Sequence, residues 1–302
     1  MSETALEEMP QHRSLWGDVW SQFRTHKGAL IGSLVFLTIV LIVVAGPFVH
    51  TIDPQYLDIL NKNLPPSWEH PMGTDNLGRD TLAQVMAGGR VSLLVGVVAM
   101  ALSLLLGAAI GVLAGYFKKL DGPLMRLTDL FLALPLLPLL LVIIMLFRDT
   151  LRSAFGPETG IFILIVFVIG ITSWMQTARI VRGDVLTIKE QEFVVAAKSI
   201  GTPSRRIILR HILPNVLSPI MVSATLGIAN AIITESALSF LGLGFPSDFP
   251  TWGRLLYDGA NFMQLTPARV IWPGLAISLT VLSVNYMGDG LRDALDPRIR
   301  GR

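Results

Sequence analysis

The chain has 302 residues, of which 52% are apolar and only 15% charged, and its mean hydropathy is +0.59. Soluble domains carry about 25% charged residues, so this composition indicates an integral membrane protein. The net charge of +2 is small and no basic stretch is interleaved with aromatic residues, which argues against a nucleic-acid-binding surface. The absence of Cys excludes disulfides, thiolate catalysis and Cys-based metal sites.

The polar start of the chain, residues 1–28, predicts a cytoplasmic amphipathic segment. Its apolar residues share one helix face, which would rest on the inner membrane surface either as an anchor or with a direct part in transport. A cleaved signal peptide has a basic start and a shorter apolar core, so we expect the following apolar run to be retained. The apolar face consists of Leu15, Trp16, Val19, Trp20 and Phe23.

Six apolar stretches are long enough to cross a hydrocarbon core, which takes roughly 20 residues of helix. Backbone polar groups inside a bilayer must be paired within the element, so these stretches predict helices. We therefore expect an all-α polytopic membrane protein with six transmembrane helices. The stretches run from Ala29 to Val49, Val91 to Phe117, Leu124 to Phe147, Gly160 to Ala178, Val216 to Leu238 and Val270 to Met287.

Two of these stretches carry residues that predict local geometry. Gly107, Gly111 and Gly115 recur at four-residue spacing, which favours close approach of another helix backbone. Pro135 and Pro138 lie in the third stretch and should bend it at mid-membrane depth. That bend could be purely structural or could lie next to a translocation path.

The distribution of basic residues predicts the orientation. Of the 24 Lys and Arg residues, 17 lie in one set of alternate loops and tails. Cytoplasmic loops carry the basic excess, so the richer set is expected inside the cell. Both termini are therefore predicted to be cytoplasmic, and the first outer loop is expected between the first two spans, within residues 50–90.

The longest hydrophilic stretch on the cytoplasmic side spans residues 179–215, here called the coupling segment. Phe193, Ala196, Ala197 and Ile200 fall at helical spacing within it and predict a short helix with a small, apolar face. Such a face would let another protein approach closely.

A turn follows this short helix. Gly201 can adopt the left-handed conformation that ends a helix, and Pro203 can open the next one. The pattern predicts two helices joined at a glycine outside the lipid. From chemistry alone, the segment could dock another protein or simply rest on lipid headgroups.

The spacing of particular residues in this segment resembles a known motif. Ala196 and Ala197 are followed after three residues by Gly201, and then by His211-Ile-Leu-Pro214. This pattern resembles the EAA loop of ABC importer permeases, whose short helix docks into an ATPase subunit. The resemblance implies that the coupling segment is a docking site.

Further blocks extend the resemblance along nearly the whole chain. Together they resemble the dipeptide, oligopeptide and nickel ABC permease family, specifically its C-type inner-membrane subunit. The resemblance implies the type I ABC importer permease fold. The blocks are Gly73-Thr-Asp75-Asn-Leu-Gly78-Arg79-Asp80, Met125-Arg126-Leu-Thr-Asp129 through Leu134-Pro135, Leu238-Ser-Phe-Leu-Gly-Leu-Gly244, and Gly288-Asp-Gly-Leu-Arg-Asp-Ala-Leu-Asp-Pro297.

The chain departs from the family motif at one position. Val195 stands where the motif has its glutamate, and Glu192, three residues earlier on roughly the same helix face, is the expected substitute. The docking residues that the resemblance implies are Glu192, Ala196, Ala197, Gly201, Arg205, Arg206 and Pro214.

The energy source must lie in another chain, because no Gly-x-x-x-x-Gly-Lys-Ser/Thr phosphate loop is present. The resemblance implies two ATP-binding subunits that use ATP and Mg²⁺, a homologous second permease and an extracytoplasmic substrate-binding protein. It implies a multi-pass protein of the cell inner membrane, in contact with lipid and without a cofactor or catalytic residue of its own. Peptides are the first expected substrates, with nickel complexes, glutathione and oligosaccharides as alternatives.

Polar residues inside the spans are candidates for function, because they are costly in hydrocarbon. Glu235, with Asn230 on a neighbouring turn, could line the outer gate, contact the partner permease or be solvated at the outer interface. Asn285 could line the path or form an interhelical hydrogen bond. Asp129 is expected to pair with Arg126 on its own helix.

Polar residues of the loops suggest scaffolding. Asp75, Arg79 and Asp80 are expected to bind the first outer loop to the bundle or to the binding protein. Thr251 is an N-cap type residue and predicts a second surface helix. The five His residues are scattered without metal-ligand spacing, so no metal site is expected.

The expected organisation has four parts, residues 1–28, 29–90, 91–290 and 291–302. They are the amphipathic segment, the first span with its outer loop, a permease core of five spans that includes the coupling segment, and a cytoplasmic tail. Two other classes of protein compete with this interpretation. The first is an ion-driven secondary transporter, which would not need a docking segment and often shows inverted repeats. The second is a membrane scaffold without transport, for which disruption of the helix around Gly201 would leave uptake unchanged.

Overall fold

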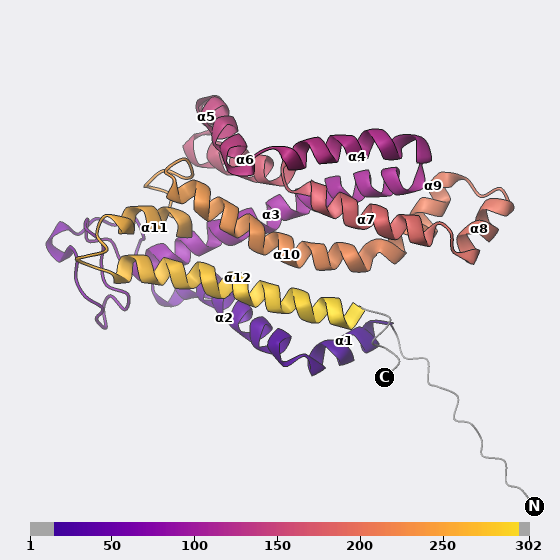
Figure 1. Ribbon diagram of the computed structural model, residues 1–302. Coiled ribbons are helices and arrows are strands. Elements are labelled where there is room, and N and C mark those ends of the chain that lie inside the picture. The colour runs from indigo at the N-terminus through magenta and orange to yellow at the C-terminus, as the bar shows by residue number, and fades with distance from the viewer. Residues whose placement is uncertain (1–14, 296–302) are drawn as a thin grey trace, which may run out of the picture.

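The computed structural model describes residues 15–295, and every regular element there is helical apart from a single bridge between Thr74 and Asp80. Figure 1 shows an elongated bundle with helices running along its long axis. The α-helices are α1 Leu15–Thr25, α2 Lys27–Val49, α3 Thr81–Tyr116, α4 Lys118–Ala133, α5 Leu136–Phe155, α6 Pro157–Ile171, α7 Trp174–Ile188, α8 Glu192–Ser199, α9 Ser204–Ile207, α10 Leu213–Phe240, α11 Trp252–Ala260 and α12 Ala268–Leu295.

Five helical stretches of the described residues are long and apolar enough to cross a membrane, and a bent pair makes a sixth if it counts as one span. The stretches agree with the all-helical polytopic fold predicted from hydropathy. The five are Lys27–Val49, Thr81–Tyr116, Pro157–Ile188, Ser204–Phe240 and Ala268–Leu295, and the bent pair is α4 with α5.

The third predicted span, Leu124 to Phe147, is not one straight helix. The chain turns by 87° between α4 and α5. Leu134 has the extended backbone (ψ 138°) that a residue before proline prefers, and Pro135 cannot donate the hydrogen bond that would continue α4. The expected bend is therefore a break in the helix.

The glycine strip of α3 packs against α7, as its spacing predicted. A Cβ added at Gly107 would lie 2.8 Å from the carbonyl oxygen of Trp174, and one at Gly111 would lie 2.7 Å from that of Ala178. Only glycine permits these backbone approaches. The helix itself begins at Thr81, ahead of the Val91 expected from hydropathy, because Asp80 caps its first turn by accepting a hydrogen bond from the Ala83 amide at 2.7 Å.

The ends of the bundle differ. Figure 1 shows α8 and α9 projecting at one end, with the start of α1 and the end of α12 nearby, and α11 with the first outer loop at the other end. The helix predicted after Thr251 is present, and the Thr251 hydroxyl accepts from the Arg254 amide. The predicted amphipathic helix is present as α1, with Val19 buried and Trp20 exposed.

Some predictions concern residues outside the described part of the chain. The beginning of the amphipathic segment, residues 1–14, and most of the expected tail, residues 296–302, lie there. The expected boundary at residues 90 and 91 falls inside α3, which runs through it without interruption.

Candidate functional site

The coupling segment contains two short helices joined at a glycine. α8 ends at Ser199, and Gly201 follows with φ +79°, the left-handed conformation expected of it. Pro203 has extended backbone and precedes the first residue of α9. The two helices leave the bundle as a compact projection (Figure 1).

The two sides of α8 have different environments. Val194 and Ala197 are buried in an apolar cluster of the chain itself, whereas Phe193, Ala196 and Ile200 are exposed. Ala197 therefore does not share the exposed face with Ala196, contrary to the spacing argument. One side of α8 attaches the helix to the bundle, and the other is available to a partner.

The charged residues expected at this site, Glu192, Arg205 and Arg206, are all exposed. Pro214 is also exposed and follows a short π-helical turn over Ile208–Ile212 that joins α9 to α10. Because Pro214 has no N–H to donate, the regular ladder cannot continue through this turn. The turn thus lies directly between the projection and a long span.

The apolar cluster beneath α8 also contains residues of three spans. Its other buried members come from α3, α7, α9, α10 and the π-helical turn, and they are Val112, Val181, Val185, Ile207, Ile212 and Val216. Movement of α8 would therefore displace the ends of α3, α7 and α10 together, because close-packed interiors transmit displacement.

Polar contacts strengthen this attachment. Lys189 donates to the Gly115 carbonyl oxygen at 2.9 Å, and the Lys198 ammonium lies 5.6 Å from the centre of the Tyr116 ring. Both contacts join the coupling segment to the end of α3.

Two ion pairs connect α4 to α7. Arg182 binds Asp121, with Nη2 2.7 Å from Oδ2, and Arg179 binds Asp129. The expected pairing of Asp129 with Arg126 is thus wrong, because the side chain of Asp129 reaches across to the neighbouring helix.

A cavity of ≈ 390 Å³ lies among the spans, and its volume falls in the range of small-molecule sites. Both interruptions of the helical spans face it, the one after α4 and the one between α6 and α7. Its lining has uncharged polar groups set among apolar side chains and no charged residue. The polar lining residues are Thr172, Ser173, Gln176, Thr177, Ser223, Asn230 and Thr234.

The three polar residues singled out within the spans occupy different environments. Asn230 is exposed and lines this central cavity. Asn285 is half-buried on α12 and does not line it. Glu235 is fully buried, so solvation at the outer interface is excluded.

Hydroxyl groups surround the Glu235 carboxylate. Ser239 donates to Oε1 at 2.7 Å, and Ser92 of α3 donates to Oε2 at 3.0 Å. The group lies between helices, and it is not among the residues that line the central cavity. It therefore contributes to the packing of α10 against α3 rather than to the wall of the cavity.

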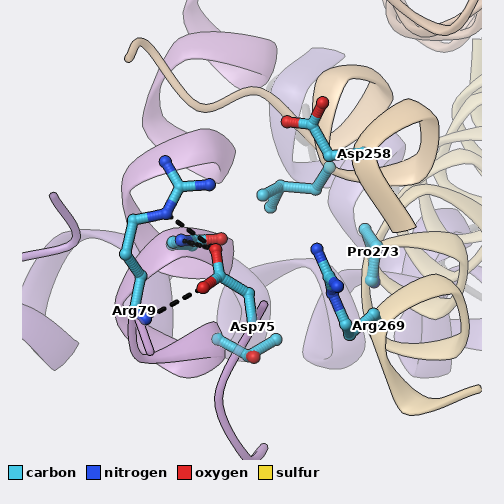
Figure 2. Close-up of a pocket in the computed structure, with 8 residues that line it drawn as sticks. Asp75, Arg79, Asp258, Arg269 and Pro273 are labelled. Atoms are coloured by element: carbon cyan, nitrogen blue, oxygen red, sulfur yellow. Dashed lines mark hydrogen bonds and ion pairs between the residues drawn. The ribbon is translucent and has the colours of Figure 1, made fainter. Parts of the chain in front are cut away.

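Asp75 is the centre of the polar contacts in the first outer loop. Figure 2 shows its carboxylate between Arg79 and the start of α12, and the Arg79 Nε atom lies 2.7 Å from Oδ2. Burial alone would raise the pKa of Asp75, but a hydrogen bond from Gln84 and the charge of Arg79 together hold that pKa below its ordinary value of 3.8. The carboxylate is a structural anion at neutral pH.

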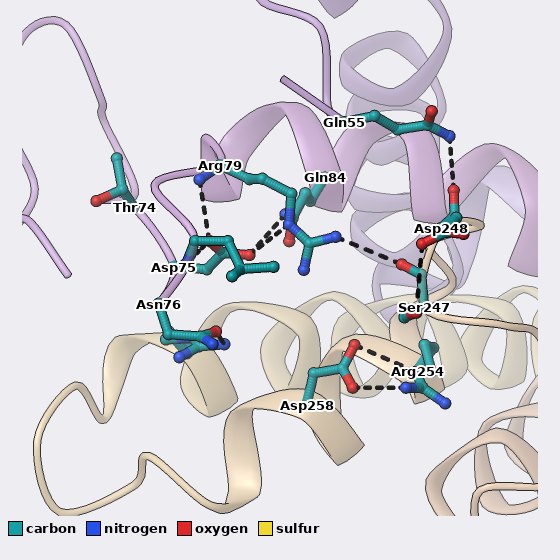
Figure 3. Close-up of polar contacts among 12 residues, drawn as sticks. Gln55, Thr74, Asp75, Asn76, Arg79, Gln84, Ser247, Asp248, Arg254 and Asp258 are labelled. Carbon is teal, nitrogen blue, oxygen red and sulfur yellow. Dashed lines mark hydrogen bonds and ion pairs between the residues drawn. The ribbon is translucent and has the colours of Figure 1, made fainter. Parts of the chain in front are cut away.

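The same cluster binds the outer loop to distant parts of the chain. Figure 3 shows Gln55 reaching the Asp248 carbonyl oxygen, at 2.6 Å, and Arg79 reaching that of Ser247. Arg269 at the start of α12 donates to Asn76 at 2.8 Å. These contacts agree with the scaffold role expected for the loop.

Two histidines that the sequence did not single out bind Asp80 at the end of the first outer loop. Asp80 is buried and binds His50 Nε2 at 2.9 Å and His70 Nδ1 at 2.8 Å while capping α3. Among residues 15–295, no group of three His, Cys, Asp or Glu could hold a metal ion. His50, His70 and Asp80 are 10 to 30 residues apart and gave no signal in the sequence, because only the fold of the loop brings them together.

These features define a class of protein, a polytopic helical bundle with a short helical projection at one end and a cavity that no charged residue lines. The family model described as binding-protein-dependent transport system inner membrane component matches residues 103–301, and the chain belongs to this family. A second model, the N-terminal TM domain of oligopeptide transport permease C, matches residues 14–66. The resemblance inferred from the sequence blocks is thereby confirmed.

Relatives with curated names cover nearly the whole chain. It is 38% identical to the oligopeptide transport system permease protein OppC of Bacillus subtilis over 95% of this chain and 91% of the relative. It is also 38% identical to the dipeptide transport system permease protein DppC of Alkalihalophilus pseudofirmus, with the same coverage. A glutathione transport system permease protein, GsiD of Escherichia coli, is 36% identical over 99% of this chain and 97% of the relative.

A solved structure confirms the fold. The chain resembles a chain of the MetNI methionine ABC transporter in an inward-facing conformation, with a TM-score of 0.55. The match covers 69% of this chain and 95% of that chain at 16% sequence identity. At this identity the likeness shows the ABC importer permease fold alone.

Proposed function

We propose that this chain is the C-type permease subunit of an ABC importer in the cell inner membrane and that its substrates are peptides or related small solutes. A homologous permease, two ATP-binding subunits and an extracytoplasmic binding protein complete the importer. The oligopeptide and dipeptide permeases among its relatives support this substrate class, and the glutathione permease keeps that tripeptide among the candidates.

The single observation that carries the proposal is the two-sided α8 helix. Its exposed side offers Phe193, Ala196 and Ile200 to an ATPase groove, and its buried side joins three spans. ATP-driven movement of the docked helix would shift the ends of those spans as a unit. The docking residues Glu192, Gly201, Arg205, Arg206 and Pro214 would form the rest of this contact.

The central cavity would be this chain's half of the translocation path. Its amide and hydroxyl groups can hydrogen-bond to peptide groups, and its lack of charge lets side chains of either sign pass. Asn230 is the path residue that this proposal selects, whereas Asn285 and Glu235 are assigned to helix contacts.

The test is uptake by the reconstituted importer in proteoliposomes, with dipeptide, glutathione and nickel complex offered in turn. Asn230→Trp should obstruct the cavity and abolish uptake while all subunits still assemble. Leu279→Trp places the same bulk on an exposed position of α12 and should leave uptake normal. Wild-type uptake by the Asn230→Trp variant would show that the cavity is not part of the translocation path. If the wild-type importer took up none of these solutes, the proposed substrate class would be contradicted.

A further inference from the structure

Glu235 is an ionisable group that the proposed transport path does not use, and it lies where the first turn of α11 meets α3 and α10. The Trp252 amide, the first in α11, donates to the Ser92 hydroxyl at 3.2 Å. Ser92 in turn donates to Glu235 Oε2 at 3.0 Å. A chain of two hydrogen bonds thus leads from a helix amide to the carboxylate.

A second chain of hydrogen bonds leads to the other carboxylate oxygen. The Arg254 amide, the third in α11, donates to the Thr251 hydroxyl at 3.1 Å. Thr251 donates to the Ser239 hydroxyl at 3.5 Å, and Ser239 donates to Glu235 Oε1 at 2.7 Å. Both chains run in the same direction and end on one side chain.

A carboxylate suits this position for a physical reason. The first amides of a helix have no partner within it, and they form the positive end of its dipole. Each hydroxyl here accepts from one side and donates to the other, so the chains need a final group that only accepts. No ion pair among the described residues involves Glu235, and both hydrogen-bond chains that reach its carboxylate begin in the first turn of α11.

The same joint is packed at backbone contact. A Cβ added at Gly88 of α3 would lie 3.1 Å from the Thr251 carbonyl carbon, and one at Gly253 of α11 would lie 2.5 Å from the Ser236 carbonyl oxygen. The Trp252 ring is fully buried, and its Nε1 donates to the Val85 carbonyl oxygen at 2.9 Å. Small shifts of α11 would therefore break these contacts together.

We propose that Glu235 is a positioning residue that caps α11 through two hydroxyl relays and so makes this outer helix move with α3 and α10 during transport. The proposal rests on the proposed function in one respect, since α10 would carry motion from the docking end to this joint. The relays themselves are independent of what is transported.

Hydrogen exchange of the assembled importer in nanodiscs tests the relays. Glu235→Ala should raise the exchange of the Trp252 and Arg254 amides about tenfold or more, because each loses the acceptor at the end of its relay. Glu235→Gln has a nearly identical shape but only one accepting oxygen, so one relay fails and exchange should rise about threefold. If Glu235 only filled space, Glu235→Gln would leave the exchange of both amides unchanged.

Two serines of α3 provide a matched pair of further variants. Ser92→Ala should loosen the Trp252 amide. Ser103→Ala removes a buried hydroxyl that has no hydrogen-bond partner within residues 15–295 and should leave exchange unchanged. The Ser92 and Gln variants keep the proposal testable if Glu235→Ala does not assemble.

A comparison of uptake with ATP hydrolysis distinguishes a positioning role of Glu235 from a purely stabilising one. In Glu235→Ala, or in Ser92→Ala if that protein alone assembles, ATP hydrolysis should continue while uptake is lost. Wild-type exchange at Trp252 in both Glu235→Gln and Ser92→Ala would overturn the proposal, and so would normal uptake by a variant whose α11 amides have loosened. A wild-type importer without uptake would instead contradict the proposed function, with the exchange measurement still deciding whether the relays exist.

Discussion

Two neighbouring alanines in α8 have opposite environments. Ala196 is exposed and Ala197 is 7% exposed, packed with Val194 in the chain's own core. Both residues belong to the motif that predicted docking, but only one of them can touch a partner without a rearrangement. Substitutions at the two positions therefore test different properties.

We expect the Ala196→Glu variant to fold normally, because an exposed substitution changes stability by about 0.5 kcal/mol or less. It should no longer bind the ATPase subunit, because the added side chain stands on the proposed docking side of α8. Ala197→Glu places a charge among apolar side chains, at a cost on the order of 3 kcal/mol, and should detach α8 from the bundle. Co-purification of the ATPase and the melting temperature distinguish the two outcomes. Equal melting temperatures for the two variants would show that Ala197 is not part of the core.

The acid sensitivity of the first outer loop follows from Asp75. The pKa of this group is lower in the folded protein than the ordinary 3.8, so its contribution to stability is fully present above that pH and is lost as the pH falls through the lowered value. We expect protease resistance of residues 50–80 to fall when the pH is brought from 7 to 3. Asp75→Asn should be less resistant at pH 7 and should change less with pH, and an unaltered pH dependence in this variant would contradict the assignment.

At the scale of elements, the contact between α3 and α7 depends on the absence of side chains. Gly111 lies against the Ala178 carbonyl oxygen and the Val181 side chain, whereas Gly122 of α4 has no atom within 4 Å of an added Cβ. The two glycines are both helical but have opposite surroundings.

We expect Gly111→Leu to destabilise the protein by about 1–3 kcal/mol or more, since rigid backbone stands where the side chain would go. Gly122→Leu should be neutral or stabilising by up to about 1 kcal/mol, because leucine is the better helix former. Thermal unfolding in detergent measures both changes. Similar losses in the two variants would mean that the helices are not closely packed at Gly111.

At the scale of the whole molecule, the coupling segment and the first outer loop lie at opposite ends of the bundle (Figure 1). The distribution of basic residues predicts that these ends lie on opposite sides of the membrane. Because the natural chain has no Cys, single cysteines can be introduced without background labelling.

Trp68 and Ile200 are largely exposed positions at these two ends, at 101% and 82% of their reference areas. We expect Trp68→Cys to react with a membrane-impermeant maleimide in intact cells, and Ile200→Cys to react only after the membrane is opened. Labelling of both positions in intact cells would overturn the predicted orientation.

The tertiary structure corrected particular predictions for identifiable reasons. Helical spacing grouped Ala197 with Ala196 because it describes one helix alone, whereas burial depends on which side meets the bundle. Asp129 was assigned to a residue on its own helix, although a neighbouring helix offered Arg179. His50, His70 and Asp80 gave no signal because loop closure, rather than spacing, brings them together.

By itself, the sequence determined the helical membrane fold, the glycine contact of α3, the interruption near Pro135 and the helix, glycine and helix order of the coupling segment. Each follows from hydrocarbon thickness or from local backbone chemistry, which short stretches of sequence contain. Only the tertiary structure decided which side of α8 is free, which polar residues line the central cavity, and that Glu235 is enclosed by hydroxyls at the start of α11. Those properties arise from contacts between residues far apart in the chain, and no local pattern encodes them.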